Sequence, residues 1–216
     1  AGDVNGDGRI DIMIPHGWWE GPAKDQLGQG VWKWHPLNLT PDGNPGYLPA
    51  ADMYTEDLDL DGDADIMMSS AHGVGVWWFE NLGGAEPKFK YHLISEAVTQ
   101  THAMHFVDLD GDGKRELITG KRWWAHGPKG DPEPNAAAVL YWFERVPGKE
   151  HAVSWKPHLI DDDSGVSTQV MAGDFTGEQS SRSLMTGRPS DRFTEINSCQ
   201  CPPVKMGSLA RSPKHP

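Results

Sequence analysis

The stretch Asp57-Leu-Asp-Leu-Asp-Gly-Asp-Ala-Asp65 decides the fold, together with the apolar run Ile66-Met-Met68 that follows it directly. Carboxylates alternate along this stretch with other residues, and a glycine stands at its sixth position. Alternating oxygen ligands around a glycine turn are typical of a calcium-binding loop. The apolar run indicates a short strand that begins where the loop ends.

This loop pattern recurs along the chain. Its other copies are Asp3-Val-Asn-Gly-Asp-Gly-Arg-Ile-Asp11 and Asp108-Leu-Asp-Gly-Asp-Gly-Lys-Arg-Glu116, and a fourth copy begins at Asp174-Phe-Thr-Gly-Glu178 and then decays. The first three copies start roughly 50 residues apart, which is the period of a four-stranded propeller blade. The repeat therefore predicts one blade for each loop.

Aromatic strands recur with the loops. Trp-Phe-Glu strands are expected at 77–80 and 141–144, Lys-x-His strands at 89–94, 155–160 and more weakly 32–37, and a further strand at 103–107. The first unit lacks a clear Trp-Phe-Glu strand, so it is expected to be variant or trimmed. The sequence thus predicts an all-β chain that forms a partial β-propeller of about three to four four-stranded blades.

Calcium (Ca2+) is the ion that these loops suit, because it takes six to eight oxygen ligands. Side chains at positions 1, 3, 5 and 9 of the turn can point inward, and the backbone carbonyl of position 7 adds one more oxygen. The predicted ligands are Asp3, Asn5, Asp7, the Arg9 carbonyl and Asp11 in the first loop; Asp57, Asp59, Asp61, the Asp63 carbonyl and Asp65 in the second; and Asp108, Asp110, Asp112, the Lys114 carbonyl and Glu116 in the third.

Two other interpretations of the loops are less well supported. An EF-hand needs a Glu at position 12 and flanking helices, but that position holds Ile14, Met68 and Thr119. Asp-Gly runs are also common in solvated turns that bind no ion. Three copies in register favour metal loops over such turns.

The three loops, with the strand starts Asp11-Ile12, Asp65-Ile66 and Glu116-Leu117, resemble the FG-GAP/VCBS repeats of integrin α-subunits and many secreted bacterial proteins. The resemblance covers about residues 1–178, although the Phe-Gly and Gly-Ala-Pro signatures of the family are not recognisable. It implies structural calcium at the rim of a propeller that closes with about seven blades. It also implies an extracellular or periplasmic location.

Two compositional regimes divide the chain at about Gln179. The chain has a net charge of −12, its excess of acidic residues lies in the part before this residue, and this acidity argues against nucleic acid as a partner. We expect propeller repeats over 1–178 and an irregular, disordered tail over 179–216, which holds both cysteines, Cys199 and Cys201. Because the repeat stops inside the fourth loop, this tail is interpreted as a degenerate segment or a reading-frame artefact. The chain is interpreted as a fragment whose partners include the missing remainder of its own propeller. No apolar run is long enough for a membrane helix.

The Trp pairs at 18–19, 77–78 and 123–124 have two interpretations, an aromatic platform for flat ligands or packing between blades. Neighbouring strand residues point to opposite faces, so packing predicts one buried and one surface Trp in each pair. His35, His92 and His158 occupy equivalent strand positions, which indicates structural hydrogen bonding. His16, His72 and His126 each follow an apolar strand, and a cluster of such residues can bind zinc or iron or act in acid–base chemistry.

Two functions remain open. The first is a secreted, calcium-stabilised module for binding or adhesion, without catalytic activity of its own, whose ligand is an unidentified protein or carbohydrate. The alternative is a carbohydrate-active lyase or isomerase on the same propeller, using His residues and a second metal. Convergence of three polar groups in one central pocket favours the enzyme, and dispersal of the His and Trp side chains between blades counts against it.

Overall fold

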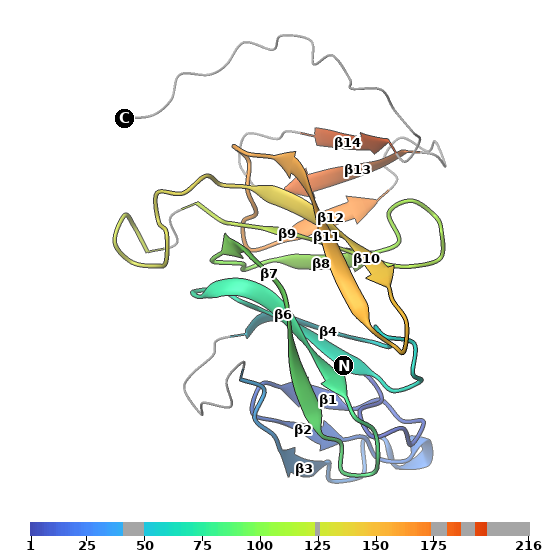
Figure 1. Cartoon of the computed structure of the whole chain (residues 1–216). Coiled ribbons are helices and arrows are strands. Elements are labelled where there is room, and N and C mark those ends of the chain that lie inside the picture. Colours follow the sequence, from blue (N-terminus) through green and yellow to red (C-terminus); the bar gives the residue numbers. More distant parts are fainter. Residues whose placement is uncertain (41–49, 124–125, 174–180, 187–192, 198–216) are drawn as a thin grey trace.

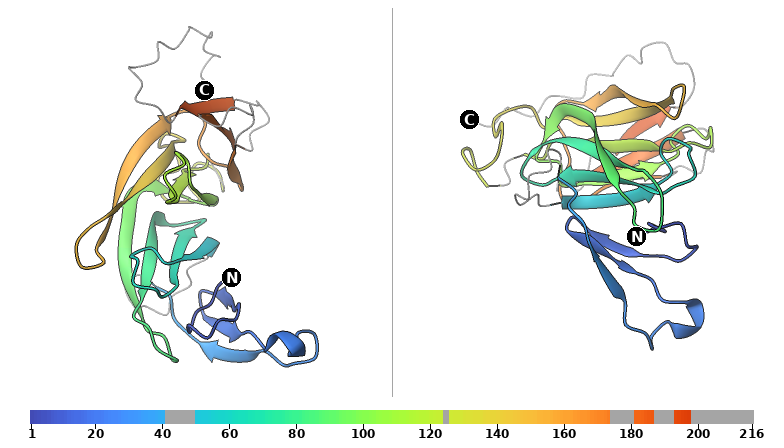
Figure 2. Two further views of the ribbon diagram at one scale, coloured as in Figure 1. Left: turned by 90° about the vertical axis from the view of Figure 1, so that its right-hand side faces the viewer. Right: turned by 60° about the horizontal axis from the view of Figure 1, so that its bottom comes forward.

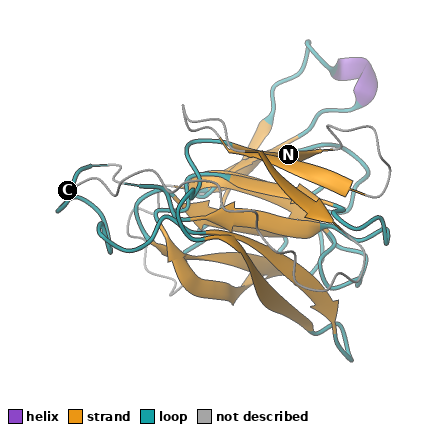
Figure 3. Ribbon diagram, turned by 90° about the horizontal axis from the view of Figure 1, so that it is seen from above, coloured by secondary structure: helices purple, strands orange, loops and turns teal. Residues whose placement is uncertain are grey.

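The computed structural model describes residues 1–40, 50–123, 126–173, 181–186 and 193–197. These residues form four antiparallel sheets. The strands are β1 (Ile12–Ile14), β2 (Gly17–Glu20) and β3 (Lys33–Pro36); β4 (Ala50–Glu56), β5 (Asp65–Ser70), β6 (Val74–Asn81) and β7 (Phe89–Thr99); β8 (Met104–Val107), β9 (Glu116–Gly120), β10 (Leu140–Pro147) and β11 (Val153–Asp161); and β12 (Val170–Gly173), β13 (Ser181–Thr186) and β14 (Phe193–Asn197). One short 3-10 helix, η1 (Lys24–Gln26), precedes β3 and is set apart from the strands in Figure 3.

Each sheet is a meander in which consecutive strands pair. We call the sheets blades 1 to 4 in chain order. Blades 2 and 3 have four strands each, and blades 1 and 4 have three. The blades follow one another along a curved row (Figures 1 and 2). This arrangement confirms the predicted all-β fold with four-stranded blades, and the described strands form an open row rather than a closed ring.

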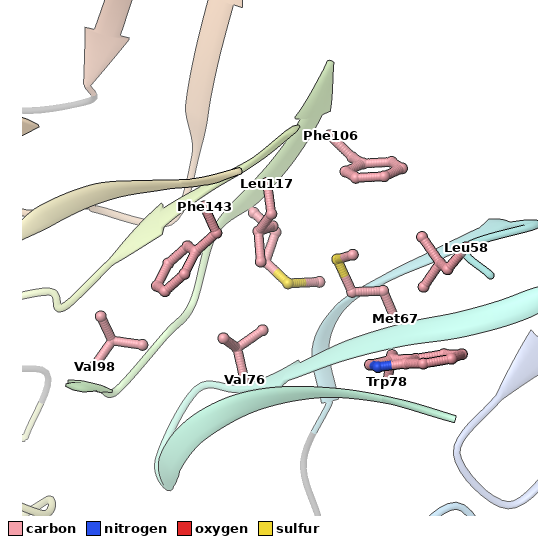
Figure 4. Packing of buried hydrophobic residues seen from close by; sticks show 9 residues of the cluster. Leu58, Met67, Val76, Trp78, Val98, Phe106, Leu117 and Phe143 are labelled. Carbon is pink, nitrogen blue, oxygen red and sulfur yellow. The ribbon is translucent and has the colours of Figure 1, made fainter. Parts of the chain in front are cut away.

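Apolar clusters fill the spaces between successive blades. Met67, Val76 and Trp78 of blade 2 face Leu117 and Phe143 of blade 3 (Figure 4). A second cluster joins blade 1 to blade 2, and a third joins blade 3 to blade 4. Each blade is thus held mainly by burial of apolar side chains against its neighbours.

Blade 1 contains the strand that the sequence analysis did not find. Its equivalent of the Trp-Phe-Glu strand is β2, Gly-Trp-Trp-Glu, and Trp18 pairs with His35 as Trp78 pairs with His92. Alignment of the repeats by sequence does not reveal β2, because its second Trp stands where the other copies have Phe. An isolated bridge between Gly2 and Asp11 replaces the pairing of the first two strands in this blade.

The middle Trp pair corrects another expectation. Trp77 and Trp78 are both buried, each only 2% exposed, so neither is a surface residue. Trp77 packs toward blade 1 and Trp78 toward blade 3, because blade 2 has a neighbour on each face. In the other pairs, Trp18 is buried and Trp123 is half exposed, and Trp124 lies outside the described residues.

The segment predicted to be an irregular tail contains two strands. β13 pairs with β12 and with β14, so the segment is not irregular over residues 181–186 and 193–197. Pairing of this kind uses backbone groups, and it therefore does not need the side-chain alternation that the sequence analysis looked for. The fourth loop, 174–178, and the rest of 179–216 lie outside the described residues.

Candidate functional site: the acidic loops

The acidic loops join the first strand of a blade to the second. The second loop runs from β4 to β5 and the third from β8 to β9. Position 9 of each loop pairs with the residue directly before position 1, as Asp11 pairs with Gly2, Asp65 with Glu56, and Glu116 with Val107. The three loops therefore close at the same register of their blades.

The first carboxylate of each loop holds the turn together from inside. In the second loop, Asp57 accepts the backbone N–H groups of Asp61 at 3.1 Å and Gly62 at 3.2 Å. Asp3 accepts the corresponding two N–H groups in the first loop. Asp108 accepts from Gly111 and Gly113 in the third.

Positions 3 and 5 each accept an N–H group two residues further along. Asp59 accepts from Asp61 at 3.2 Å and Asp61 from Asp63 at 2.9 Å. The first and third loops repeat both bonds. These bonds between residues two apart curl the chain around its own acidic groups. Each bond uses one oxygen of the side chain.

Left-handed backbone allows this curl. Position 6 is glycine in all three loops, with positive φ angles of 82° at Gly8, 100° at Gly62 and 88° at Gly113. The sequence predicted this turn from the glycine alone. Position 4 is also left-handed, and there the second loop has Leu60 at φ 66° where the other loops have glycine.

The carboxylate at position 9 closes each loop onto its own second residue. Its oxygen accepts the backbone N–H of Val4 at 2.9 Å in the first loop, of Leu58 at 2.8 Å in the second, and of Leu109 at 2.7 Å in the third. These three residues are buried between the blades. Each loop is thus anchored by the buried apolar side chain at position 2 and by the carboxylate at position 9 that binds the backbone of the same residue.

In the first two loops, the second oxygen of position 9 accepts a backbone N–H at the end of the following hairpin strand or directly after it. Asp11 accepts the N–H of Gly21 at 2.8 Å, and Asp65 accepts that of Asn81 at 2.8 Å. Sequence reasoning assigned these two side chains to metal binding and missed their role in closing the loop. The signal for that role was their place directly before an apolar run, where Asp65 is the first residue of the buried strand β5 and Asp11 directly precedes β1.

Three acids converge in the second loop and three in the third. Carboxylate oxygens of Asp57, Asp59 and Asp61 lie within 4.8 Å of one another, and so do those of Asp108, Asp110 and Glu116. The longer Glu116 side chain reaches its cluster while still closing the loop. These oxygen-only donor sets fit a hard cation such as calcium.

Burial makes the closing carboxylates costly to ionise. Desolvation raises the pKa of Asp65 to about 7 and that of Glu116 to about 7, against the effect of the backbone N–H groups, and neighbouring loop acids add to the rise. The pKa of Asp11 is raised for the same reasons. A divalent cation in the loop opposes this repulsion, because it favours the charged form of every carboxylate around it.

The charge at position 7 distinguishes the loops. Arg9 forms an ion pair with Asp7 in the first loop, and Lys114 lies 2.6 Å from Asp112 in the third. The second loop has Asp63 at this position, so no cation of its own offsets its acids. The second loop is therefore the most negative of the three.

A second repeated group lies on the outer strands. The rings of His35, His92 and His158 stack on Trp18, Trp78 and Trp142, with ring centroids 4.1, 4.5 and 4.0 Å apart. The same histidines donate through Nε2 to Glu20, Glu80 and Glu144, at 2.8, 2.5 and 2.9 Å. These bonds confirm the structural role predicted for the three histidines.

A lysine completes the group in each blade. Lys33, Lys90 and Lys156 lie 3.5, 2.9 and 3.2 Å from the same glutamates. Residues two apart in a strand point to the same face, so the Lys and the His of the Lys-x-His pattern both reach one carboxylate.

Comparison with known protein families agrees with this geometry. Residues 57–119, from the second acidic loop through most of β9, match the model of the FG-GAP-like repeat. No curated protein matches the chain. Among the described residues, no helix is long and apolar enough to span a membrane.

Proposed function

We propose that this FG-GAP/VCBS repeat-containing protein is a calcium-stabilised propeller module that serves extracellular binding or adhesion. Calcium binds in the three acidic loops, through the side chains at positions 1, 3, 5 and 9 and the backbone carbonyl of position 7. Its role is structural, because each loop fastens the first two strands of a blade to the apolar core between blades.

One observation carries the proposal: the same hydrogen-bonded turn is built three times around acidic side chains, and in the second and third loops three carboxylates converge. Such a turn is costly without an ion, because the carboxylates repel one another and the closing one is buried. The second loop is expected to bind calcium most tightly, since it has the highest negative charge.

An extracellular location follows from the chemistry of weak calcium loops. Millimolar calcium outside the cell fills loops whose dissociation constants are too high for cytosolic calcium to occupy. The partner is an unidentified protein or carbohydrate. The segment 126–138, which extends from blade 3, offers a contact surface away from the acidic loops (Figure 1).

The test is thermal unfolding of the chain with calcium, with chelator, and with magnesium at equal concentration. At a calcium concentration a hundredfold above Kd, each occupied loop adds about 2.7 kcal/mol to the free energy of unfolding. Magnesium is expected to add less, because it demands a smaller octahedral site and keeps its water. An unfolding temperature that is the same in calcium and in chelator would contradict the proposal.

A carbohydrate-active lyase or isomerase is the second candidate. The observation that favours it is the convergence of His72, His126 and Asp131 from two blades. Its test is a screen of keto-sugars and uronides for elimination products, with an Asp131→Asn variant as the control. Turnover by both proteins, or by neither, would count against this site as the origin of any activity.

A further inference from the structure

Three side chains of the types that bind metal ions, contributed by two blades, meet at the end of the sheets opposite the acidic loops. His72 lies in the turn between β5 and β6, and His126 and Asp131 lie between β9 and β10. One ligand atom of each lies within 4.8 Å of the others. These segments join second to third strands, whereas the acidic loops join first to second, so the two kinds of site occupy opposite ends of the blades (Figure 1).

The Asp131 carboxylate is the centre of this cluster. Its two oxygens lie 3.0 Å from His72 Nδ1 and 3.0 Å from His126 Nδ1. The two imidazole rings are 4.6 Å apart between centroids. The Asp131 side chain is only 5% exposed, while both imidazoles reach solvent. The cluster is therefore fixed at its buried carboxylate and accessible at its nitrogens.

The neighbours of His72 Nδ1 make opposite demands on that nitrogen. Arg122 Nη2, which has only protons to donate, lies 3.2 Å away, and the ionised Asp131 carboxylate, which only accepts, lies 3.0 Å away. A neutral imidazole nitrogen cannot satisfy both. A cation held between Nδ1 and the carboxylate removes this conflict, and Arg122 Nη2 keeps its bond to the Ala71 carbonyl at 3.0 Å.

Unused hydrogen-bonding capacity lies beside the cluster. Gln100 Nε2 donates to the carbonyl of Pro132, the residue after Asp131, at 2.9 Å. Gln100 Oε1 and Arg122 Nε are buried, and neither has a hydrogen-bond partner among the described residues. Buried polar atoms without partners are uncommon in folded proteins. Gln100 Oε1 can accept from water beside the cluster, whereas Arg122 Nε can only donate and is not a metal ligand.

We propose that His72, His126 and Asp131 bind a divalent transition metal of the zinc class, which ties blade 2 to blade 3 at this end. Two imidazole nitrogens and one carboxylate oxygen form a three-ligand set with room for water or a ligand at the fourth position. Nitrogen donors favour zinc over calcium, whose ligands are oxygens. The site is independent of the calcium proposed for the acidic loops.

The test titrates the full chain, freed of metal by chelator, with Zn2+ by calorimetry in saturating calcium. The wild-type chain is expected to bind zinc at this site, and His126→Gln to bind it at least about tenfold more weakly. His16→Gln is the matched control, because His16 lies in the corresponding turn of blade 1. Its zinc affinity is expected to equal that of the wild type.

Two further measurements separate binding from folding. Arg122→Gln is expected to strengthen zinc binding, because it removes a cation beside the site. Co2+ in place of zinc reports nitrogen coordination through its visible absorption spectrum. His126→Gln is expected to change this spectrum and to leave the unfolding temperature of the metal-free chain the same. Equal zinc affinity in wild type and His126→Gln, or displacement of the zinc by millimolar calcium, would overturn the proposal.

Discussion

The Asp65 carboxylate accepts the backbone N–H of Leu58 at 2.8 Å, so the last acid of the second loop is bonded to the loop's own second residue. The other Asp65 oxygen accepts the N–H of Asn81, at the end of β6. One side chain thus joins the loop, the second strand and the third strand of blade 2. Because it is buried, its removal affects the fold with or without an ion.

Asp65→Ala is expected to lower the free energy of unfolding by about 1–3 kcal/mol in chelator, because two buried N–H groups lose their acceptor. In calcium the loss is expected to be larger, since the second loop also loses a ligand. Denaturant unfolding under both conditions measures the two losses.

Asp61→Ala is the matched comparison. Asp61 is an exposed member of the same loop, and it accepts the N–H of Asp63. Its removal is expected to cost little in chelator and to reduce stability mainly in calcium. If both variants lost the same stability in chelator, Asp65 would have no special part in closing the loop.

Leu60→Gly is expected to stabilise the chain by about 1 kcal/mol, because Leu60 has a positive φ of 66° that glycine adopts without steric cost. Its side chain is 58% exposed, so its loss removes little packing. Gly62→Ala, two residues away at φ 100°, is expected to destabilise the chain by about the same amount or more. Chemical denaturation of both variants in chelator measures these effects, and a Leu60→Gly chain less stable than the wild type would show that this side chain contributes packing.

Acidification is expected to weaken the repeated Glu–His–Lys groups. Hydrogen bonds from His158 and Lys156 lower the pKa of Glu144 below its ordinary value of about 4.5. Because the folded chain holds this proton less tightly than the unfolded chain, the pair stabilises the fold above pH 4.5, and this contribution is lost as the pH falls through the lower pKa.

The variant Glu144→Gln tests this dependence. Its unfolding temperature is expected to be below that of the wild type at pH 7, and the difference is expected to shrink as the pH falls toward 3. The effect is small, since the Glu144 side chain is 40% exposed and water screens the pair. A difference that stays constant over this pH range would mean that the pairing does not depend on the charge of Glu144.

Local sequence carried most of the information about the acidic loops. The positions of the acids, the glycine turn at position 6 and the strand that follows the loop can all be read from residues within one short segment, because hydrogen bonds between near neighbours define the turn. The repeat period likewise indicated blades, and the equivalent strand positions of three histidines indicated structural hydrogen bonding, which the bond from His158 to Glu144 exemplifies.

Only the tertiary structure decided the roles that depend on distant partners. Trp77 and Trp78 are both buried because blade 2 has neighbours on two faces, and no local pattern reports how many neighbours a sheet has. The bond from Asp65 to Asn81 and the meeting of His72 with His126 likewise join residues far apart in the chain. The sequence by itself determined the loops and the kind of fold, since each loop is built within one short segment and the repeat period reports the blades. Packing of one blade on the next determined which side chains are buried and which histidines meet.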